Sequence, residues 1–240
     1  MDVTTFRALH QNRAPGDPLV LPGPWDAASA RVFAEAGFAA LATPSAGVSA
    51  SLGYADGEAP ADEMFAAVTR IVRAVTEFGV PVSADLEGGY GLSPKDLVAR
   101  VQDTGAVGVN LEDSTADGLK DPHRHADWLA EVRAAAGPAL FVNARVDTYV
   151  RGMKDPDETI GRARLYVEAG ADGIYPIMAP PEHLPTLAAA IPSPLNALAL
   201  PGSPPPRELG ELGATRVTFG PGLQRRAMAA VRDIARDLLT

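Results

Sequence analysis

Short apolar runs alternate with longer amphipathic stretches along the whole chain. The apolar runs predict strands, and the stretches between them, where apolar residues recur every three or four positions, predict helices. The predicted strands cover residues 18–23, 39–44, 81–86, 107–112, 140–145, 173–178, 195–200 and 215–220. The predicted helices cover residues 26–36, 60–78, 93–104, 124–136, 156–170, 180–190, 204–213 and 221–238. This order predicts eight strand-helix units and therefore eight parallel strands.

The near-continuous apolar character of these runs is typical of parallel strands that are covered on both sides. Closing eight such strands into a cylinder leaves no exposed edge, so we expect an α/β fold of the (β/α)8 TIM-barrel type, with residues 1–240 as a single domain. The alternative is an open, doubly wound sheet. Its usual glycine-rich GxGxxG turn is absent after the first strand, where the sequence reads PGPWDAA.

Composition narrows the possible partners. The chain has 240 residues and a net charge of −9, and it shows no run of Lys and Arg that would bind a phosphate backbone, so we expect no nucleic-acid partner. It contains no cysteine, which excludes disulfides, zinc thiolate sites and thiol catalysis. No apolar run is long enough to span a bilayer and the first residues lack a signal-peptide pattern, so we expect no membrane association and a cytoplasmic location.

Polar residues gather where the predicted strands end. In a barrel these ends meet at one mouth, which is where active sites of this fold form. Carboxylates without His or Cys neighbours favour Mg²⁺ or Mn²⁺ over zinc. The alternative is a buried structural network in which Asp85 and Glu112 pair with Arg145. The polar residues at the strand ends are Ser45, Asp85, Glu87, Glu112, Asp113, Asn143, Arg145, Asp147 and, at the start of its strand, Asn196.

Several segments, taken in order, resemble the isocitrate lyase and phosphoenolpyruvate mutase superfamily. They are PWDAASARVFAEAGFAALATPSAG, YADGE, PVSADLEGGYG, VGVNLED, FVNAR and LNALALPG, and the match as a whole runs from about residue 18 to residue 222. The resemblance implies a (β/α)8 barrel that uses Mg²⁺ to make or break C–C or P–C bonds of small 2-oxo or 2-hydroxy carboxylic acids. It implies a metal site made by Asp85 directly and by Glu87 and Glu112 through bound water.

The same resemblance assigns roles to other residues. Asp56 matches an acidic residue that the family keeps near the metal, and with Glu112 and Arg145 it makes up the expected catalytic set. Arg145 is expected to grip a substrate carboxylate, because its planar guanidinium matches that geometry. The residues expected to contact substrate are Trp25, Ser45, Ala46, Gly47, Arg145 and Asn196.

The sequence departs from the superfamily in the loop 113–125. Isocitrate and methylisocitrate lyases carry a cysteine acid there, and the mutases a motif resembling PKTNS, whereas this chain reads DSTADGLKDPHRH. We therefore expect a lyase of the decarboxylase-like type, which acts through a metal-stabilised enolate. The loop offers no strong acid, and its Gly and Asp content predicts a mobile lid. His123 and His125 are expected to be solvated, and the alternative is that they contact substrate.

Two other functions remain open at this stage. One is an aldol-type transferase resembling ketopantoate hydroxymethyltransferase. The other is a phosphate-binding or metabolite-binding barrel without lyase chemistry, with Gly202, Gly220 and Gly222 as its cradle. We expect a homo-oligomer, a dimer or a tetramer, although the extra C-terminal helix that many relatives exchange between subunits is expected to be absent or truncated.

Overall fold

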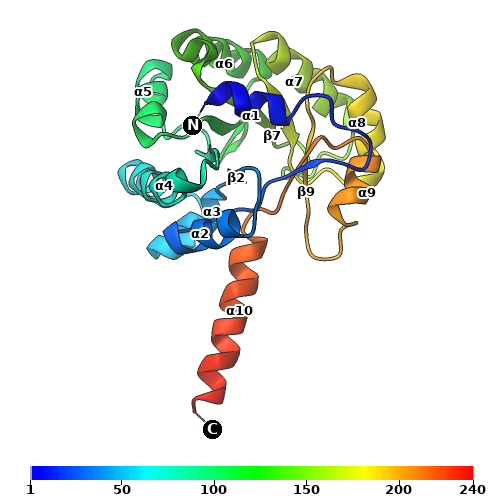
Figure 1. The fold of residues 1–240 in the computed structure, drawn as a ribbon. Coiled ribbons are helices and arrows are strands. Elements are labelled where there is room, and N and C mark those ends of the chain that lie inside the picture. The colour runs from blue at the N-terminus through cyan, green and yellow to red at the C-terminus, as the bar shows by residue number, and fades with distance from the viewer. Residues whose placement is uncertain (1, 240) are drawn as a thin grey trace.

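The computed structural model describes residues 2–239 and contains eight parallel barrel strands. The helices lie around the outside of the barrel (Figure 1). All pairings between neighbouring barrel strands are parallel, which confirms the eight predicted strands, although several are shorter than predicted. The barrel strands are β1 (Leu19–Val20), β2 (Leu41–Ala42), β3 (Val82–Asp85), β4 (Gly108–Glu112), β7 (Phe141–Val146), β8 (Gly173–Pro176), β9 (Asn196–Leu198) and β10 (Arg216–Thr218).

The strands form two sheets, β2-β3-β4-β7-β8 and β1-β10-β9, which are joined at both seams. At one seam the Ile174 amide donates to the Pro194 carbonyl at 2.9 Å, next to a parallel bridge between Ile174 and Leu195. At the other seam the Ala42 amide donates to the Pro22 carbonyl at 3.1 Å. The barrel is therefore closed, and the open doubly wound sheet is excluded.

Helices follow the strands and surround the barrel, as predicted. Asp26 caps the first of them through a capping box, in which its side chain accepts from the Ser29 amide at 2.7 Å. Gly105 and Gly170 follow two helices with φ of +78° and +97°, a conformation that lets the chain turn at once into the next strand. The predicted helices correspond to α2 (Ala27–Glu35), α4 (Ala61–Val75) with η1 (Thr76–Phe78), α5 (Pro94–Thr104), α6 (Pro122–Ala136) with η2 (Gly137–Ala139), α7 (Pro156–Glu168), η3 (Pro181–His183) with α8 (Leu184–Ala190), α9 (Pro206–Glu211) and α10 (Gly222–Asp237).

Three elements were not predicted from the sequence. They are α1 (Val3–Leu9), α3 (Ser45–Leu52) and a small antiparallel hairpin formed by β5 (Ser114–Thr115) and β6 (Gly118–Leu119). Residues 45–47, expected to extend a strand end, instead form the first turn of α3, where the Val48 amide bonds to the Pro44 carbonyl at 2.9 Å.

The hydrophobic core has two parts. The larger part lies between the barrel and its helices and holds the outward-facing strand residues, such as Val109 and Val142. The smaller part closes the N-terminal end of the barrel, where α1 inserts Phe6 edge-on against Phe141 with ring centroids 5.3 Å apart. Burying one such ring contributes about 1.5–3 kcal/mol. The α1 helix therefore seals one end and leaves the opposite end open as the mouth.

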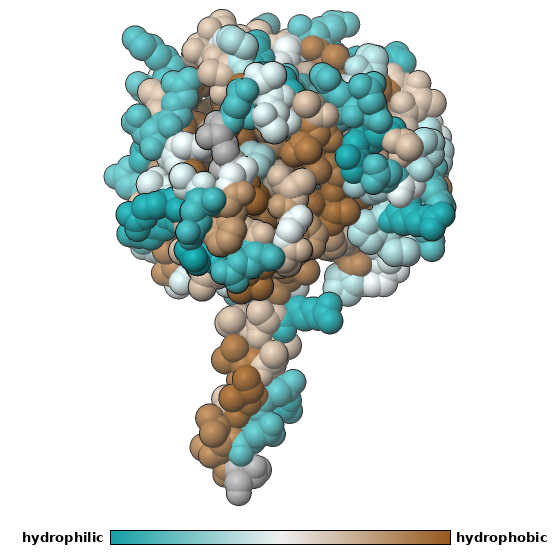
Figure 2. All heavy atoms as spheres, in the orientation of Figure 1, coloured by the Kyte–Doolittle hydropathy of each residue, from teal (hydrophilic) through white to brown (hydrophobic). Residues whose placement is uncertain are grey.

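The α10 helix projects away from the barrel (Figure 1). Apolar side chains line one side of it and charged side chains the other (Figure 2). Val231, Ile234 and Leu238 are 51 %, 58 % and 82 % exposed, and their spacing places them on one face. In residues 2–239 no helix combines the length and the apolar composition needed to cross a membrane.

Candidate functional site

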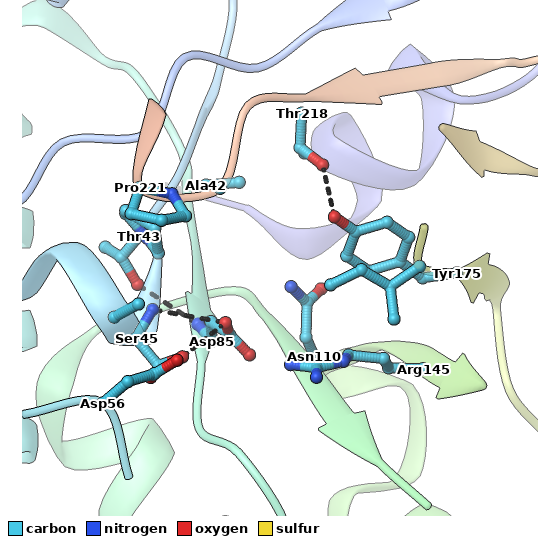
Figure 3. A pocket seen from close by; sticks show the side chains of 14 residues that line it. Ala42, Thr43, Ser45, Asp56, Asp85, Asn110, Arg145, Tyr175, Thr218 and Pro221 are labelled. Carbon is cyan, nitrogen blue, oxygen red and sulfur yellow. Dashed lines mark hydrogen bonds between the residues drawn. The ribbon is translucent and has the colours of Figure 1, made fainter. Parts of the chain in front are cut away.

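Two adjoining cavities open at the C-terminal end of the barrel, and both are lined by Ser45, Asp56 and Arg145. The inner pocket has a volume of about 120 Å³, and the outer cavity has about 850 Å³. The inner pocket is lined by residues 42–46, Asp56, Asp85, Asn110, Arg145, Tyr175, Ile177, Thr218, Gly220 and Pro221 (Figure 3). The outer cavity adds, among others, Glu87, Glu112, Lys120, Asp147 and Arg151.

Asp85 stands at the end of β3 and faces the inner pocket. One of its oxygens, Oδ2, accepts hydrogen bonds from the Ser45 hydroxyl at 2.8 Å and the Ser45 amide at 3.2 Å (Figure 3). This amide lies in the first turn of α3, whose positive end favours a carboxylate. The other oxygen, Oδ1, is buried and has no hydrogen-bond partner among residues 2–239. A buried carboxylate oxygen without a partner is costly, so this atom is suited to bind a ligand.

Glu87 lies two residues after Asp85, in the turn before Gly88. Its backbone adopts φ of +53°, which is uncommon for a residue with a side chain and which turns the carboxylate into the outer cavity. Burial raises the pKa of Glu87 to about 7, with further contributions from the charges of Asp85 and Asp56. Asp56 lies in the loop between α3 and α4, and burial, followed by the charge of Asp85, raises its pKa as well. The mouth therefore concentrates negative charge, which a divalent cation would neutralise.

Arg145, at the end of β7, contacts two of the carboxylates. It forms an ion pair with Glu112 at 2.7 Å and a two-pronged pair with Asp147. Burial raises the pKa of Glu112 to about 8 in spite of Arg145, because Asp147, Asp85 and Glu87 add negative charge. The alternative of a buried structural network, in which Asp85 and Glu112 pair with Arg145, is thus found in part. Glu112 pairs with Arg145, but among the described residues Arg145 has no ion pair with Asp85.

The loop 113–125 is anchored to the barrel at both ends. Ser114 donates to Asp147 at 2.5 Å, and the Lys120 ammonium donates to the Glu112 carbonyl at 2.9 Å. Asp113 is fully buried and accepts from Tyr166 at 2.7 Å. These bonds tie residues 113, 114 and 120 to the barrel, and the β5-β6 hairpin lies between them; that the loop moves as a lid stays a prediction.

His125 lies elsewhere than expected. It occupies the first turn of α6, is 2 % exposed, and stacks on Trp128 with ring centroids 5.6 Å apart. The expectation that it is solvated is wrong, because the helix turns it inward; burial lowers its pKa to about 3. His123 is exposed, as expected. In this geometry neither histidine lines the inner pocket.

The structure brings most of the predicted site residues together. Ser45, Ala46, Asp56, Asp85 and Arg145 line the inner pocket, and Glu87 and Glu112 line the outer cavity. The other three lie outside both linings. Trp25 packs edge-on against Phe33, Gly47 lies against Pro44 and Trp25 behind the pocket, and Asn196 is buried inside the barrel.

The sequence interpretation missed Asn110, Tyr175 and Thr218, which line the inner pocket. Asn110 and Tyr175 stand within β4 and β8, and Thr218 is the last residue of β10. The signal that could have found Asn110 is the two-residue period of a strand, because Asn110 and Glu112 point to the same side of β4.

The donor set fits a magnesium ion that keeps most of its water. Within the described chain, no three His, Cys, Asp or Glu side chains are placed to hold one metal ion together. Mg²⁺ commonly binds through one or two carboxylates and several waters. The partnerless Oδ1 of Asp85 would provide the direct ligand, and Glu87 and Glu112 line the adjoining cavity, where water ligands would lie.

Comparison with known proteins agrees with this geometry. Residues 6–239 match the family profile described as phosphoenolpyruvate phosphomutase. An uncharacterised protein of Mycobacterium tuberculosis is 39 % identical over 218 residues, which cover 90 % of this chain and 81 % of that protein. The crystal structure of a putative phosphonomutase from Burkholderia cenocepacia J2315 superposes with a TM-score of 0.89 at 38 % identity, covering 98 % of this chain and 99 % of the other.

A second solved structure bears on the chemistry. It is oxaloacetate acetylhydrolase in complex with its product oxalate, with a TM-score of 0.86 at 26 % identity, covering 96 % of this chain and 84 % of the other. The chain described here is a lyase-type enzyme that belongs to the phosphoenolpyruvate mutase family, within the isocitrate lyase and phosphoenolpyruvate mutase superfamily of enzymes acting on C–C or P–C bonds of small carboxylates.

Proposed function

We propose that this enzyme is a Mg²⁺-dependent lyase, decarboxylase-like, that cleaves a small 2-oxo dicarboxylate in the inner pocket; Mn²⁺ could replace Mg²⁺. The observation that carries the proposal is the partnerless Oδ1 of Asp85, a residue that lines a pocket of about 120 Å³ together with Ser45 and Arg145. A pocket of this size suits a small acid, and its walls combine a metal ligand with hydrogen-bond donors.

The chain's own residues bind and orient the acid. Ser45 and Ala46 line the pocket at the first turn of α3, where backbone amides favour an anionic group. Arg145 offers a guanidinium whose Nη1 is bound to Glu112. A substrate carboxylate can compete with Glu112 for this nitrogen, because the Glu112 pKa of about 8 allows its carboxyl to be neutral. The bidentate contact with Asp147 meanwhile holds the guanidinium in place.

A bound Mg²⁺ would supply Lewis-acid stabilisation of the negative charge that develops on the 2-oxo oxygen. Asp85 would hold it directly, and Glu87, Glu112 and Asp56 would hold or orient its waters.

Decarboxylation suits the groups around the pocket better than cleavage of a tricarboxylate. Loss of CO₂ leaves an enolate that can take its proton from water, whereas cleavage of a tricarboxylate such as isocitrate releases a carbanion-like succinate that needs a dedicated proton donor. The loop 113–125 has no thiol, and its Ser114 and Lys120 are both engaged in hydrogen bonds to the barrel. His125 is buried away from the pocket. These features support a reaction without a strong acid on this loop.

The test is a product screen with the purified protein, with and without Mg²⁺. Candidate substrates are oxaloacetate, malate analogues, phosphonopyruvate, isocitrate and methylisocitrate, and the assays measure pyruvate, oxalate and glyoxylate. We expect Mg²⁺-dependent pyruvate release from oxaloacetate or a close relative. Oxalate release would instead indicate the hydrolytic reaction that gives the related acetylhydrolase its name. No product from any 2-oxo acid would overturn the proposal.

We also propose that the protein is a homo-oligomer, a dimer or a tetramer, held together in part by α10. An isolated helix of this length is marginally stable in water, so its apolar face needs a partner. Val231, Ile234 and Leu238 form a continuous stripe on a helix that extends away from its own barrel, and a second copy presents the same stripe. The occupant of this face is therefore another copy of the chain.

A further inference from the structure

The interior of the barrel below the inner pocket is polar. The interiors of such barrels are usually filled by branched apolar side chains. Here five buried polar residues occupy adjacent interior positions, and hydrogen bonds and strand register link four of them across the barrel. The five are Ser83, Asn110, Asn143, Asn196 and Arg216.

Arg216 carries a buried charge in this polar interior. It is 1 % exposed, and no ion pair of Arg216 is found in the described part of the chain. Its Nη2 donates to Asn110 Oδ1 at 3.4 Å, while its Nε and Nη1 are buried without a partner among residues 2–239. Burial lowers the pKa of Arg216 to about 10, so the group remains charged at neutral pH. An unpaired buried cation is costly and calls for a functional explanation.

A guanidinium can only donate hydrogen bonds, so Arg216 determines which atom of each neighbouring side chain acts as the acceptor and which as the donor. Asn110 must turn its oxygen toward Arg216, and this oxygen also accepts from Asn143 Nδ2 at 2.8 Å. The same Asn143 nitrogen donates to Asn196 Oδ1 at 3.2 Å. Because the Asn110 oxygen faces Arg216 and Asn143, its amide nitrogen points the other way, toward the inner pocket that Asn110 lines. This nitrogen makes no hydrogen bond to another described residue.

The same order of donors and acceptors continues along the hydrogen-bond chain to the wall of the inner pocket. Asn196 Nδ2 donates to the Thr218 hydroxyl at 3.0 Å, and Thr218 donates in turn to the Tyr175 hydroxyl at 3.3 Å (Figure 3). Tyr175 therefore accepts at its oxygen and keeps its own proton for another acceptor. Burial raises the pKa of Tyr175 to about 12, so the hydroxyl stays protonated in the physiological range.

Asn110 and Tyr175 both line the inner pocket, near Asp85 and Arg145 (Figure 3). We propose that Asn110 Nδ2 and the Tyr175 hydroxyl form a donor floor that binds a carboxylate or enolate oxygen of the substrate, and that Arg216 is the positioning residue that fixes their direction. Donors fixed before substrate arrives, in a site shielded from water, stabilise a developing oxyanion effectively. This inference rests on the proposed function, because it places a 2-oxo acid in the inner pocket.

The first test measures binding rather than turnover. Oxalate, a planar dianion that resembles the enolate of a 2-oxo acid, is titrated into the full-length protein by calorimetry in the presence of Mg²⁺. Tyr175→Phe removes one donor to a charged acceptor, so we expect oxalate to bind roughly 10- to 100-fold more weakly. The matched control is Tyr149→Phe, because the Tyr149 hydroxyl contacts His183 outside both cavities and should leave affinity unchanged.

The second test separates positioning from structural support. Arg216→Met removes an unpaired buried charge, so the melting temperature should stay level or rise, while oxalate affinity falls at least tenfold. Arg216→Lys restores a donor and should recover part of the affinity. A purely structural Arg216 would give a lower melting temperature and normal affinity.

The outcomes distinguish this inference from the proposed function. Equal oxalate affinity in wild type and Tyr175→Phe, or no oxalate binding to the wild type, overturns the donor floor. Weaker binding in Tyr175→Phe without turnover of any 2-oxo acid overturns the proposed function and leaves the donor floor standing. Should Arg216→Met fail to fold, the Tyr175→Phe and Arg216→Lys titrations still decide.

Discussion

Arg145 holds Asp147 through two parallel hydrogen bonds, from Nε to Oδ1 at 2.6 Å and from Nη2 to Oδ2 at 2.9 Å. The two residues lie at the end of β7 and just beyond it, and Asp147 is almost fully buried. One edge of the guanidinium is thus occupied by the protein itself. Its remaining nitrogen, Nη1, pairs with Glu112, so the proposed substrate carboxylate would compete with Glu112 for this atom.

Arg145→Lys should therefore impair both binding and stability. A lysine supplies one point charge and cannot reproduce the paired bonds to Asp147. We expect kcat/KM to fall by at least about tenfold and the melting temperature to drop. Kinetics and thermal unfolding measured on the same preparation check this. Normal kinetics with a lowered melting temperature would show that Arg145 serves only the network.

Asp85→Ala should abolish Mg²⁺-dependent turnover without unfolding the protein. Its carboxylate borders a cavity, and its removal relieves repulsion with Asp56 and Glu87. Calorimetry measures whether the variant still binds Mg²⁺, and circular dichroism measures whether it is folded. Asp103→Ala, an exposed site on α5, is the matched control, and Glu87→Gln should have a smaller effect because a water can take its place. Mg²⁺-dependent activity in Asp85→Ala is incompatible with the assigned ligand.

Stability of the metal-free protein should fall as pH rises from about 6.5 to 8; below this window the lowered pKa values of the buried His10 and His125, about 3 each, act in the opposite direction because only the unfolded state takes up their protons. The folded-state pKa values of Glu87 and Glu112, about 7 and about 8, lie above the ordinary value of 4.5. The folded state therefore binds more protons than the unfolded state across this window, and raising the pH favours unfolding. Each kcal/mol lost lowers the melting temperature by about 2–4 °C. Melting curves in EDTA measure the slope, and Glu112→Gln should flatten it; a slope that Glu112→Gln leaves unchanged would assign the effect to other groups.

Isocitrate and methylisocitrate should not be cleaved at a measurable rate, and thiol-alkylating reagents should leave any activity unchanged. The chain has no cysteine, and the loop residues Ser114 and Lys120 are bound to the barrel. Glyoxylate and pyruvate assays with and without iodoacetamide provide the measurement. Robust product from either substrate would show that a non-thiol acid suffices, and the choice of decarboxylation would fail.

The double variant Val231→Asp/Ile234→Asp should shift the protein to a smaller species. Two charges on the apolar face of α10 oppose its burial against a second copy. Sedimentation velocity of the variant and the wild type measures the change. Arg236→Asp is the matched control, since it adds a negative charge on the opposite face. A wild type that sediments as a monomer, or a double variant that keeps the oligomer, contradicts self-association through α10.

The barrel was predictable from the sequence because its strands are buried on the helix-facing side and apolar there. The α3 helix was not, since Ser45–Leu52 reads SAGVSASL and has no polar face to produce a helical period. Its conformation is set by tertiary contacts, including the bond from its first amide to Asp85.

The candidate site was predictable where polar residues end a strand, as at Asp85, Glu112 and Arg145. Residues that face the barrel interior from within a strand were harder to interpret. Asn110 and Tyr175 sit among apolar neighbours in sequence, and only the closure of the barrel brings them into the pocket. Asn196 shows the converse, because its place at a strand start suggested substrate contact, while closure buries it beneath the pocket.

The packing of α1 against the N-terminal end of the barrel has a consequence for the order of folding during synthesis. Phe6 packs against Phe141 and beside Gly108, so the residues that receive α1 leave the ribosome long after α1 itself. Until β4 and β7 have paired, the apolar side of α1 has no site to occupy. The N-terminal end of the barrel is thus covered late, by contacts between residues far apart in sequence. A nascent chain paused before Phe141 would expose the apolar side of α1 to chaperones.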